Sequence, residues 1–199
     1  IAPYLKRAIP EALWRETVCL VVHPGPPGDR GPASLDWAIL EGMQQWGVTV
    51  LQANAVMDGG DVWATRTFPI RAARKSSLYR NEVAEAACAA VLEAVERFSH
   101  EGIPVRQSGG RFRPAMPQEM RRIDWQRDDT ATVLAKIRAS DGAPGVLDCH
   151  LEEAGRLHRI ASAQELASML PPPSRSARTL PARRTDLVEF IVNRILSHG

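Results

Sequence analysis

The sequence predicts an α/β protein in which a mostly parallel sheet is flanked by helices. The run 17–22 (TVCLVV) is short, apolar and rich in β-branched residues, which is typical of a strand buried on both faces. Apolar residues recur at helical spacing between Leu78 and Phe98, which predicts one long helix. Strand-like and helix-like segments alternate over residues 1–98, as in α/β folds.

Three segments of this first part are expected strands: 17–22, 48–51 and 62–68. The last two are separated by Asp58-Gly59-Gly60-Asp61, which predicts a tight turn. The start, Ile1-Ala2-Pro3, reads as the end of a further strand whose earlier half is absent. We therefore expect a partial sheet that lacks its first βαβ portion.

Helices are expected to cover this sheet, after a loop and a short helix within 4–14. Ser34 can cap a helix whose apolar positions continue to Trp46. Ser76 or Ser77 can cap the long helix that ends near Phe98.

The later part of the chain is less regular. The expected divisions are a catalytic domain 1–98, a polar, Gly-containing linker 99–112, the start of a second domain 113–147, and an unassigned helical or irregular tail 148–199. In the second domain, Asp128 or Asp129 can cap a short helix with Val133, Leu134 and Ile137 turned inward. Weak helices are expected in the tail at 163–170 and 186–196.

Composition excludes several classes of protein. Lys and Arg number 25 against 23 Asp and Glu, and the net charge of +2 does not predict a nucleic-acid partner. RNA contact through the basic stretch near Arg183 is a weaker alternative, and it predicts salt-sensitive binding. The three cysteines include no CxxC pair that would indicate a metal site. No apolar run approaches 18 residues, so we expect a cytoplasmic protein without a membrane partner.

His23 directly follows the first complete strand of the predicted sheet. Open α/β sheets bind ligands at the carboxyl ends of their strands, so this position favours a catalytic role. The alternative is a histidine that only caps the strand end or binds a main-chain carbonyl.

Asp58 lies in a turn beside glycines, where a carboxylate can approach a neighbouring loop. Together with His23 it would form an acid–base pair in which the carboxylate orients the imidazole. The alternative is that Asp58 only forms the turn, since Asp-Gly is a common turn dipeptide. In the loop after His23, Asp29 and Arg30 could pair with each other, or Arg30 could hold an anionic ligand group.

Several co-linear motifs resemble the folate-dependent formyltransferases, and within them the N-terminal part of the HypX/HoxX hydrogenase-maturation proteins. The motifs are APYLKRAIP at 2–10, VHPG at 22–25, GDRGP at 28–32, LDWAI at 35–39, GVTV at 47–50, DGGDVWA at 58–64 and KSSLYRNE at 75–82. Later segments, at 113–114, 123–125 and 137–146, resemble the start of the second formyltransferase domain. The resemblance extends to about Leu147.

The resemblance implies a Rossmann-like fold and formyl transfer from 10-formyltetrahydrofolate toward coenzyme A, in maturation of a nickel–iron hydrogenase. It also implies hydrogenase-maturation proteins as partners, and no metal. His23 and Asp58 match the catalytic residues of the family. The loop matching Leu5, Lys6, Arg7 and Ala8 lines part of the family's folate pocket.

Two departures accompany this resemblance. The family usually has Asn two residues before the histidine, where this chain has Val21, which cannot donate a hydrogen bond to an oxyanion. Beyond Leu147 the β-rich continuation expected of the family does not follow. The alternative to an enzyme is a non-catalytic, truncated remnant or a partner-binding fragment.

Overall fold

The computed structural model describes the chain except for residues 4, 6, 125, 142–145, 149–158 and 161–199. Contacts divide the chain into two units: Ile1–Ala72 with Ser76–Met116, and Ala73–Lys75 with Pro117–Gly199. The helices expected at 163–170 and 186–196 lie outside the described residues.

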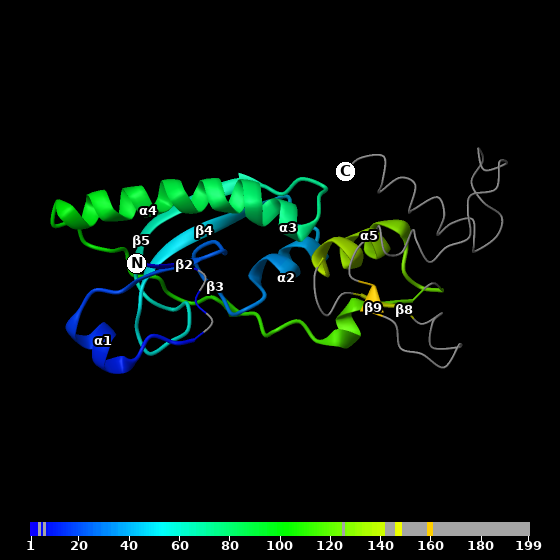
Figure 1. Ribbon diagram of the computed structural model, residues 1–199, viewed down its shortest axis with the longest axis horizontal. Coiled ribbons are helices and arrows are strands. Elements are labelled where there is room, and N and C mark those ends of the chain that lie inside the picture. Colours follow the sequence, from blue (N-terminus) through cyan, green and yellow to red (C-terminus); the bar gives the residue numbers. More distant parts are fainter. Residues whose placement is uncertain (4, 6, 125, 142–145, 149–158, 161–199) are drawn as a thin grey trace. The chain divides into compact units, whose positions relative to one another are not determined.

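A four-stranded sheet of order β1-β2-β4-β5 organises the first unit (Figure 1). Its strands are β1 (Ala2–Pro3), β2 (Leu20–His23), β4 (Gln45–Gln52) and β5 (Val62–Pro69). β1 and β2 are parallel, whereas β2–β4 and β4–β5 are antiparallel. The α/β class with flanking helices is confirmed.

The antiparallel share of this mixed sheet is larger than the sequence pattern predicted. The segment 53–61 between β4 and β5 is shorter than the dozen or so residues that a parallel crossover needs. β2 also begins three positions later than the predicted strand and includes His23 as its last residue.

Helices of the first unit are α1 (Glu11–Glu16), α2 (Ser34–Leu40), α3 (Lys75–Leu78) and α4 (Ala84–Ser99), with one π-helical turn, η1 (Tyr79–Val83), between α3 and α4. The long helix is thus confirmed, but Ser76 and Ser77 lie inside α3 instead of capping it.

The expected helix from Ser34 to Trp46 was wrong at both ends. α2 stops at Leu40 because Gly42 adopts a left-handed φ of 66° and its N–H bonds back to the Ile39 oxygen. Trp46 therefore lies in β4. At the start, Ala33 occupies the cap position, and the Ser34 hydroxyl donates to the Pro24 oxygen instead.

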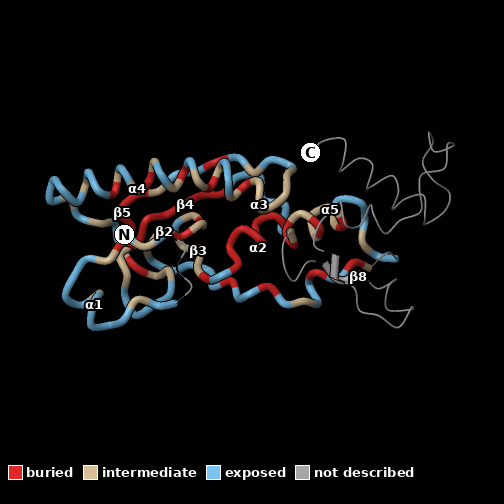
Figure 2. The backbone as a smooth tube through the Cα atoms, viewed as in Figure 1, coloured by how far each residue is buried: buried red, intermediate tan, exposed pale blue. Residues whose placement is uncertain are grey.

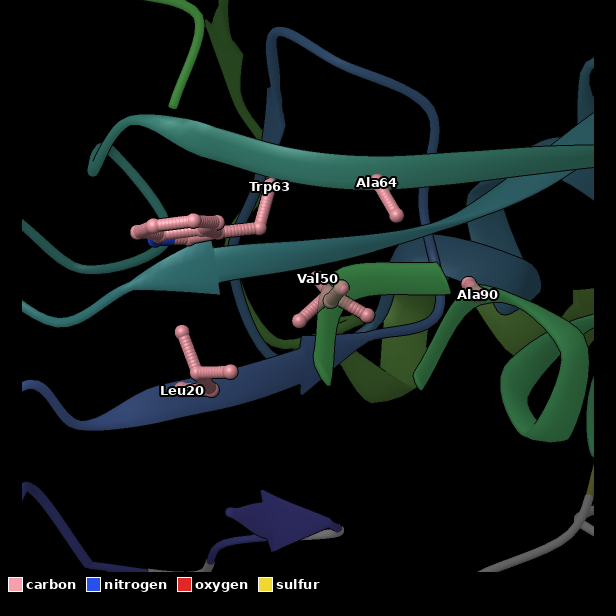
Figure 3. Close-up of a cluster of buried hydrophobic side chains, with 6 residues drawn as sticks. Leu20, Val50, Trp63, Ala64 and Ala90 are labelled. Atoms are coloured by element: carbon pink, nitrogen blue, oxygen red, sulfur yellow. The ribbon is translucent and has the colours of Figure 1, made fainter. Parts of the chain in front are cut away.

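One hydrophobic cluster joins the sheet to α4. Its members come from β2, β4, β5 and α4, and Figure 3 shows most of them between these elements: Leu20, Val50, Trp63, Ala64, Ala90 and Ala94. The helix contributes alanines, whose small side chains let α4 lie close against the sheet. In Figure 2 the middle of β4 is accordingly buried, while α4 alternates between buried and exposed positions.

The predicted linker, 99–112, packs into the first unit. Val105 exchanges two main-chain hydrogen bonds with Val62 of β5. β6 (Arg111–Phe112) pairs in parallel with β3 (Asp29–Arg30) in the loop after His23. Because of these pairings, the boundary between the two units follows Met116.

The second unit contains a 3-10 turn, η2 (Gln118–Arg121), and a helix, α5 (Thr130–Ala139). Its sheet has the order β7-β8-β9, formed by β7 (Arg122–Ile123), β8 (Val146–Asp148) and β9 (Arg159–Ile160). Asp129 caps α5 by accepting from the Thr132 N–H at 2.8 Å, which confirms one predicted cap. Val133 and Ile137 are buried, whereas Leu134 is only partly buried.

Candidate active site

His23 is buried at the carboxyl end of β2, and β4 holds the loop that follows it. The Thr49 hydroxyl of β4 donates to the Gly25 oxygen at 2.7 Å. The Trp46 Nε1 donates to the Pro24 oxygen at 3.0 Å. These bonds satisfy two carbonyl groups of the loop and fix the direction in which the chain leaves His23.

Asp58 lies in the connection between β4 and β5, where the predicted turn is present. Its φ of 50° is left-handed, a conformation that Asp tolerates better than most residues. Gly60 is required beside it, because a Cβ there would lie 1.6 Å from the Gln52 oxygen. The Asp58 Oδ2 accepts from the Gly31 N–H at 3.0 Å, so the turn is attached to the loop after His23.

The structure brings the two predicted catalytic residues together. The His23 Nδ1 lies 3.5 Å from the Asp58 Oδ2. The His23 side chain is 4% exposed and that of Asp58 is 15% exposed. Asp58 is therefore the more exposed member of the pair.

A second carboxylate, which sequence reasoning did not assign to the site, contacts the other ring nitrogen. The Asp29 Oδ2 lies 3.0 Å from the His23 Nε2. Asp29 pairs with Arg113, whose Nε donates to its Oδ1 at 2.6 Å, and not with Arg30 as the sequence had suggested. The Arg113 Nη1 in turn donates to Glu41 at 2.7 Å.

This buried network keeps its charges. Burial by itself raises the pKa of Asp29, but hydrogen bonds from His23, Ser34 and Arg113 outweigh it and lower that pKa. Burial likewise lowers the pKa of Arg113, and its bonds to Glu41 and Asp29 raise it on balance. Asp29 therefore stays an anion against which His23 is held.

Gln107 joins the two loops of the site. Its Oε1 accepts from the Gly28 N–H at 3.0 Å, and its Nε2 donates to the main-chain oxygens of Asp58 and Gly60. Neither Gln107 nor Arg113 carries a sequence signal for this role, because both lie far along the chain from the loops they contact. Asp29 lies within the GDRGP motif, which was a signal that sequence reasoning did not use.

The residues expected to bind folate lie beyond β1. Leu5, Arg7 and Ala8 are exposed, and Lys6 lies outside the described residues. Pro3 is paired with Val22 in the parallel β1–β2 ladder. The carboxyl end of β1 therefore lies at the same end of the sheet as His23.

A cleft of about 420 Å³ adjoins the loop after His23. Gly28 and Gln107 line it, together with residues of β5, α4 and the segment 105–108, while His23 and Asp58 do not. Among residues that the structure describes, no group of His, Cys, Asp or Glu side chains is arranged to hold a metal ion. No helix in the same part of the chain is long and apolar enough to cross a membrane.

Comparison with known proteins identifies the class. Residues 2–95 match the formyl transferase family, so this part of the chain belongs to that family. The chain also resembles the hydrogenase maturation factor HoxX of Bradyrhizobium diazoefficiens, with 51% identity over 174 residues. That match covers 85% of this chain and 31% of HoxX.

A solved structure gives the same result. HypX from Aquifex aeolicus, in complex with tetrahydrofolic acid, matches with a TM-score of 0.71 and 54% identity over 73% of this chain and 26% of that one. A methionyl-tRNA formyltransferase of Citrifermentans bemidjiense is 27% identical over 149 residues, which cover 73% of this chain and 46% of the enzyme. The chain thus spans less than a third of the length of HoxX and of HypX.

Proposed function

We propose that the site around His23 and Asp58 transfers a formyl group from 10-formyltetrahydrofolate, with coenzyme A as acceptor, during maturation of a nickel–iron hydrogenase. The observation that carries this proposal is the 3.5 Å contact between His23 Nδ1 and Asp58 Oδ2 at a strand end of a formyl transferase domain. The HoxX likeness and the tetrahydrofolate complex of HypX support the pathway and the donor.

The reaction assigns a task to each residue. The thiol sulfur bonds to the formyl carbon, whose oxygen becomes anionic, and the bond from that carbon to the folate nitrogen then breaks. The thiol proton ends on the folate nitrogen. A His23 ring protonated on both nitrogens donates a hydrogen bond from Nδ1 to the anionic oxygen, and Asp58 accepts the thiol proton and passes it to the folate nitrogen.

Because position 21 is a valine, His23 must provide more of the hydrogen bonding to the anionic oxygen. Val21 and His23 alternate with Val22 along β2, so they share one side of the strand. An aliphatic side chain cannot donate to the oxyanion, which leaves His23 and main-chain N–H groups as donors. The main chain at Leu5–Ala8 would meet the pterin, at the sheet edge where His23 lies.

Titration and kinetics on the complete protein that carries this sequence test the proposal. Tetrahydrofolate binding is measured by calorimetry, and formyl-coenzyme A formation by chromatography. We expect His23→Ala and Asp58→Ala each to lower kcat about 100-fold or more while tetrahydrofolate still binds. His100→Ala, at the exposed end of α4, is the matched control and should leave kcat unchanged.

Three results would contradict the proposal. Near-normal turnover in both site variants would remove these residues from the chemistry. Formyl transfer to another acceptor would contradict only the assignment of coenzyme A as the acceptor. Cooperative unfolding without any shift on adding tetrahydrofolate would favour the non-catalytic alternative.

A further inference from the structure

The two carboxylates on the His23 ring differ in distance, burial and anchoring. We propose that Asp29, held by Arg113, is the positioning residue that fixes the His23 ring at Nε2, and that Asp58, the more exposed carboxylate beside Nδ1, serves in proton transfer. This inference rests on the proposed function and divides between two residues the roles that the sequence assigned to Asp58.

Distance favours Asp29 as the residue that holds the ring. The His23 Nε2 lies 3.0 Å from the Asp29 Oδ2, within the normal range for a hydrogen bond, whereas the His23 Nδ1 lies 3.5 Å from the Asp58 Oδ2. The same Asp58 oxygen already accepts from the Gly31 N–H at 3.0 Å. Asp29 therefore constrains the ring more tightly than Asp58 does.

The burial of Asp29 and its bond to Arg113 also favour Asp29 as the residue that holds the His23 ring. The Asp29 side chain is 4% exposed, against 15% for Asp58. The other Asp29 oxygen is bound by Arg113, whose guanidinium also lies over the Trp46 ring at 5.4 Å. A carboxylate held at both oxygens in a buried position orients an imidazole well but cannot readily exchange protons with substrate.

Gly25 makes the close approach of Asp29 possible. A Cβ at this position would lie 2.4 Å from the His23 Nε2 and 2.5 Å from the Asp29 Oδ2. Only a residue without a side chain at position 25 leaves space for the hydrogen bond between His23 and Asp29.

The charged groups around the ring are Asp29 and Asp58 in direct contact, and Arg113 and Glu41 beyond Asp29. With this arrangement, a proton on Nε2 has a fixed acceptor, and Nδ1 faces Asp58, the more exposed of the two carboxylates. The arrangement places Arg113, Asp29, His23 and Asp58 in series.

Nitrogen-15 NMR of the His23 ring in the complete protein tests directly whether Nε2 carries the proton that is bonded to Asp29. In the wild type we expect a proton on Nε2 near neutral pH, hydrogen-bonded to Asp29. An Nε2 that carries no proton would overturn the inference whatever the variants do.

Asp29→Asn should change the Nε2 signal and lower kcat roughly 100-fold, with the KM for the folate donor nearly unchanged. Glu16→Gln is the control, because Glu16 is exposed at the end of α1 and makes none of the contacts around the His23 ring. Its kcat should stay within about threefold of the wild type.

Circular dichroism establishes whether each variant folds. If Asp29→Asn does not fold, Arg113→Lys serves instead, since it keeps a cation beside Asp29 but lacks the Nε–H donor. It should give a smaller loss of kcat and a detectable change at Nε2. Wild-type kcat and ring signals in a folded Asp29 or Arg113 variant would refute the inference. If His23→Ala also keeps wild-type activity, the proposed function fails together with this inference.

Discussion

Gln107 and Asp58 lie 49 residues apart in the sequence, and the Gln107 Nε2 donates a hydrogen bond of 2.9 Å to the main-chain oxygen of Asp58. The same side chain bonds Gly60 and Gly28. A residue of the predicted linker therefore sets the distance between the loop after His23 and the turn that carries Asp58.

Gln107→Ala should weaken both the fold and the site. The loss of three partly buried hydrogen bonds should lower the free energy of unfolding by about 1 to 3 kcal/mol. Formyl transfer should fall roughly tenfold or more, because the turn is no longer held at its distance from His23. Urea unfolding and initial-rate kinetics measure the two effects.

Gln126→Ala is the control, since its side chain is exposed and lies in the other unit. Equal losses in the two variants would show that Gln107 has no special part in the site.

Gly31→Ala should be much more costly than Gly42→Ala, although both glycines have a positive φ. A Cβ at Gly31 would lie 2.0 Å from the Arg113 oxygen, while none meets an atom within 4 Å at Gly42. We expect a loss of about 1 to 2 kcal/mol at Gly42 from backbone strain alone, and more than about 3 kcal/mol at Gly31. Urea unfolding curves give both values, and similar values would show that the backbone around Arg113 yields to the added methyl group.

Acid should remove the stabilisation that Asp29 provides. The pKa of Asp29 is lower in the fold than its ordinary value of 3.8, so its carboxylate stabilises the protein fully above that value. As the pH falls below about 4 and through the lowered pKa, this contribution is lost. The stability gap between wild type and Asp29→Asn should therefore be constant from about pH 5 to about pH 7, above the ordinary carboxyl pKa, and close toward about pH 2.

Urea unfolding of both proteins across this pH range measures the gap. Glu16→Gln, at an exposed position at the end of α1, is the control and should show a small gap at every pH. A gap for Asp29→Asn that widens in acid would contradict the ionised, bonded carboxylate described above.

Local patterns were sufficient for several elements. The β-branched run located β2, the apolar stripe located the long helix, and Asp129 was one of the two residues predicted to cap α5. The end of α2 was missed although it too is local, because apolar residues at helical spacing continue past Gly42 to Trp46, and Gly47 was predicted as the stop. Trp46 belongs instead to β4, which begins only five positions after the last residue of α2.

The sequence by itself located His23 at the carboxyl end of a strand and Asp58 in a turn beside glycines, since both depend on residues only a few positions away. Only the tertiary structure decided which charge faces each side of the His23 ring. Arg113 reaches Asp29 across 84 positions of the chain, and such a pairing depends on how β3 and β6 meet. Periodicity and turn chemistry carry no information on contacts at that separation, because they depend on near neighbours in the sequence and not on the meeting of distant segments.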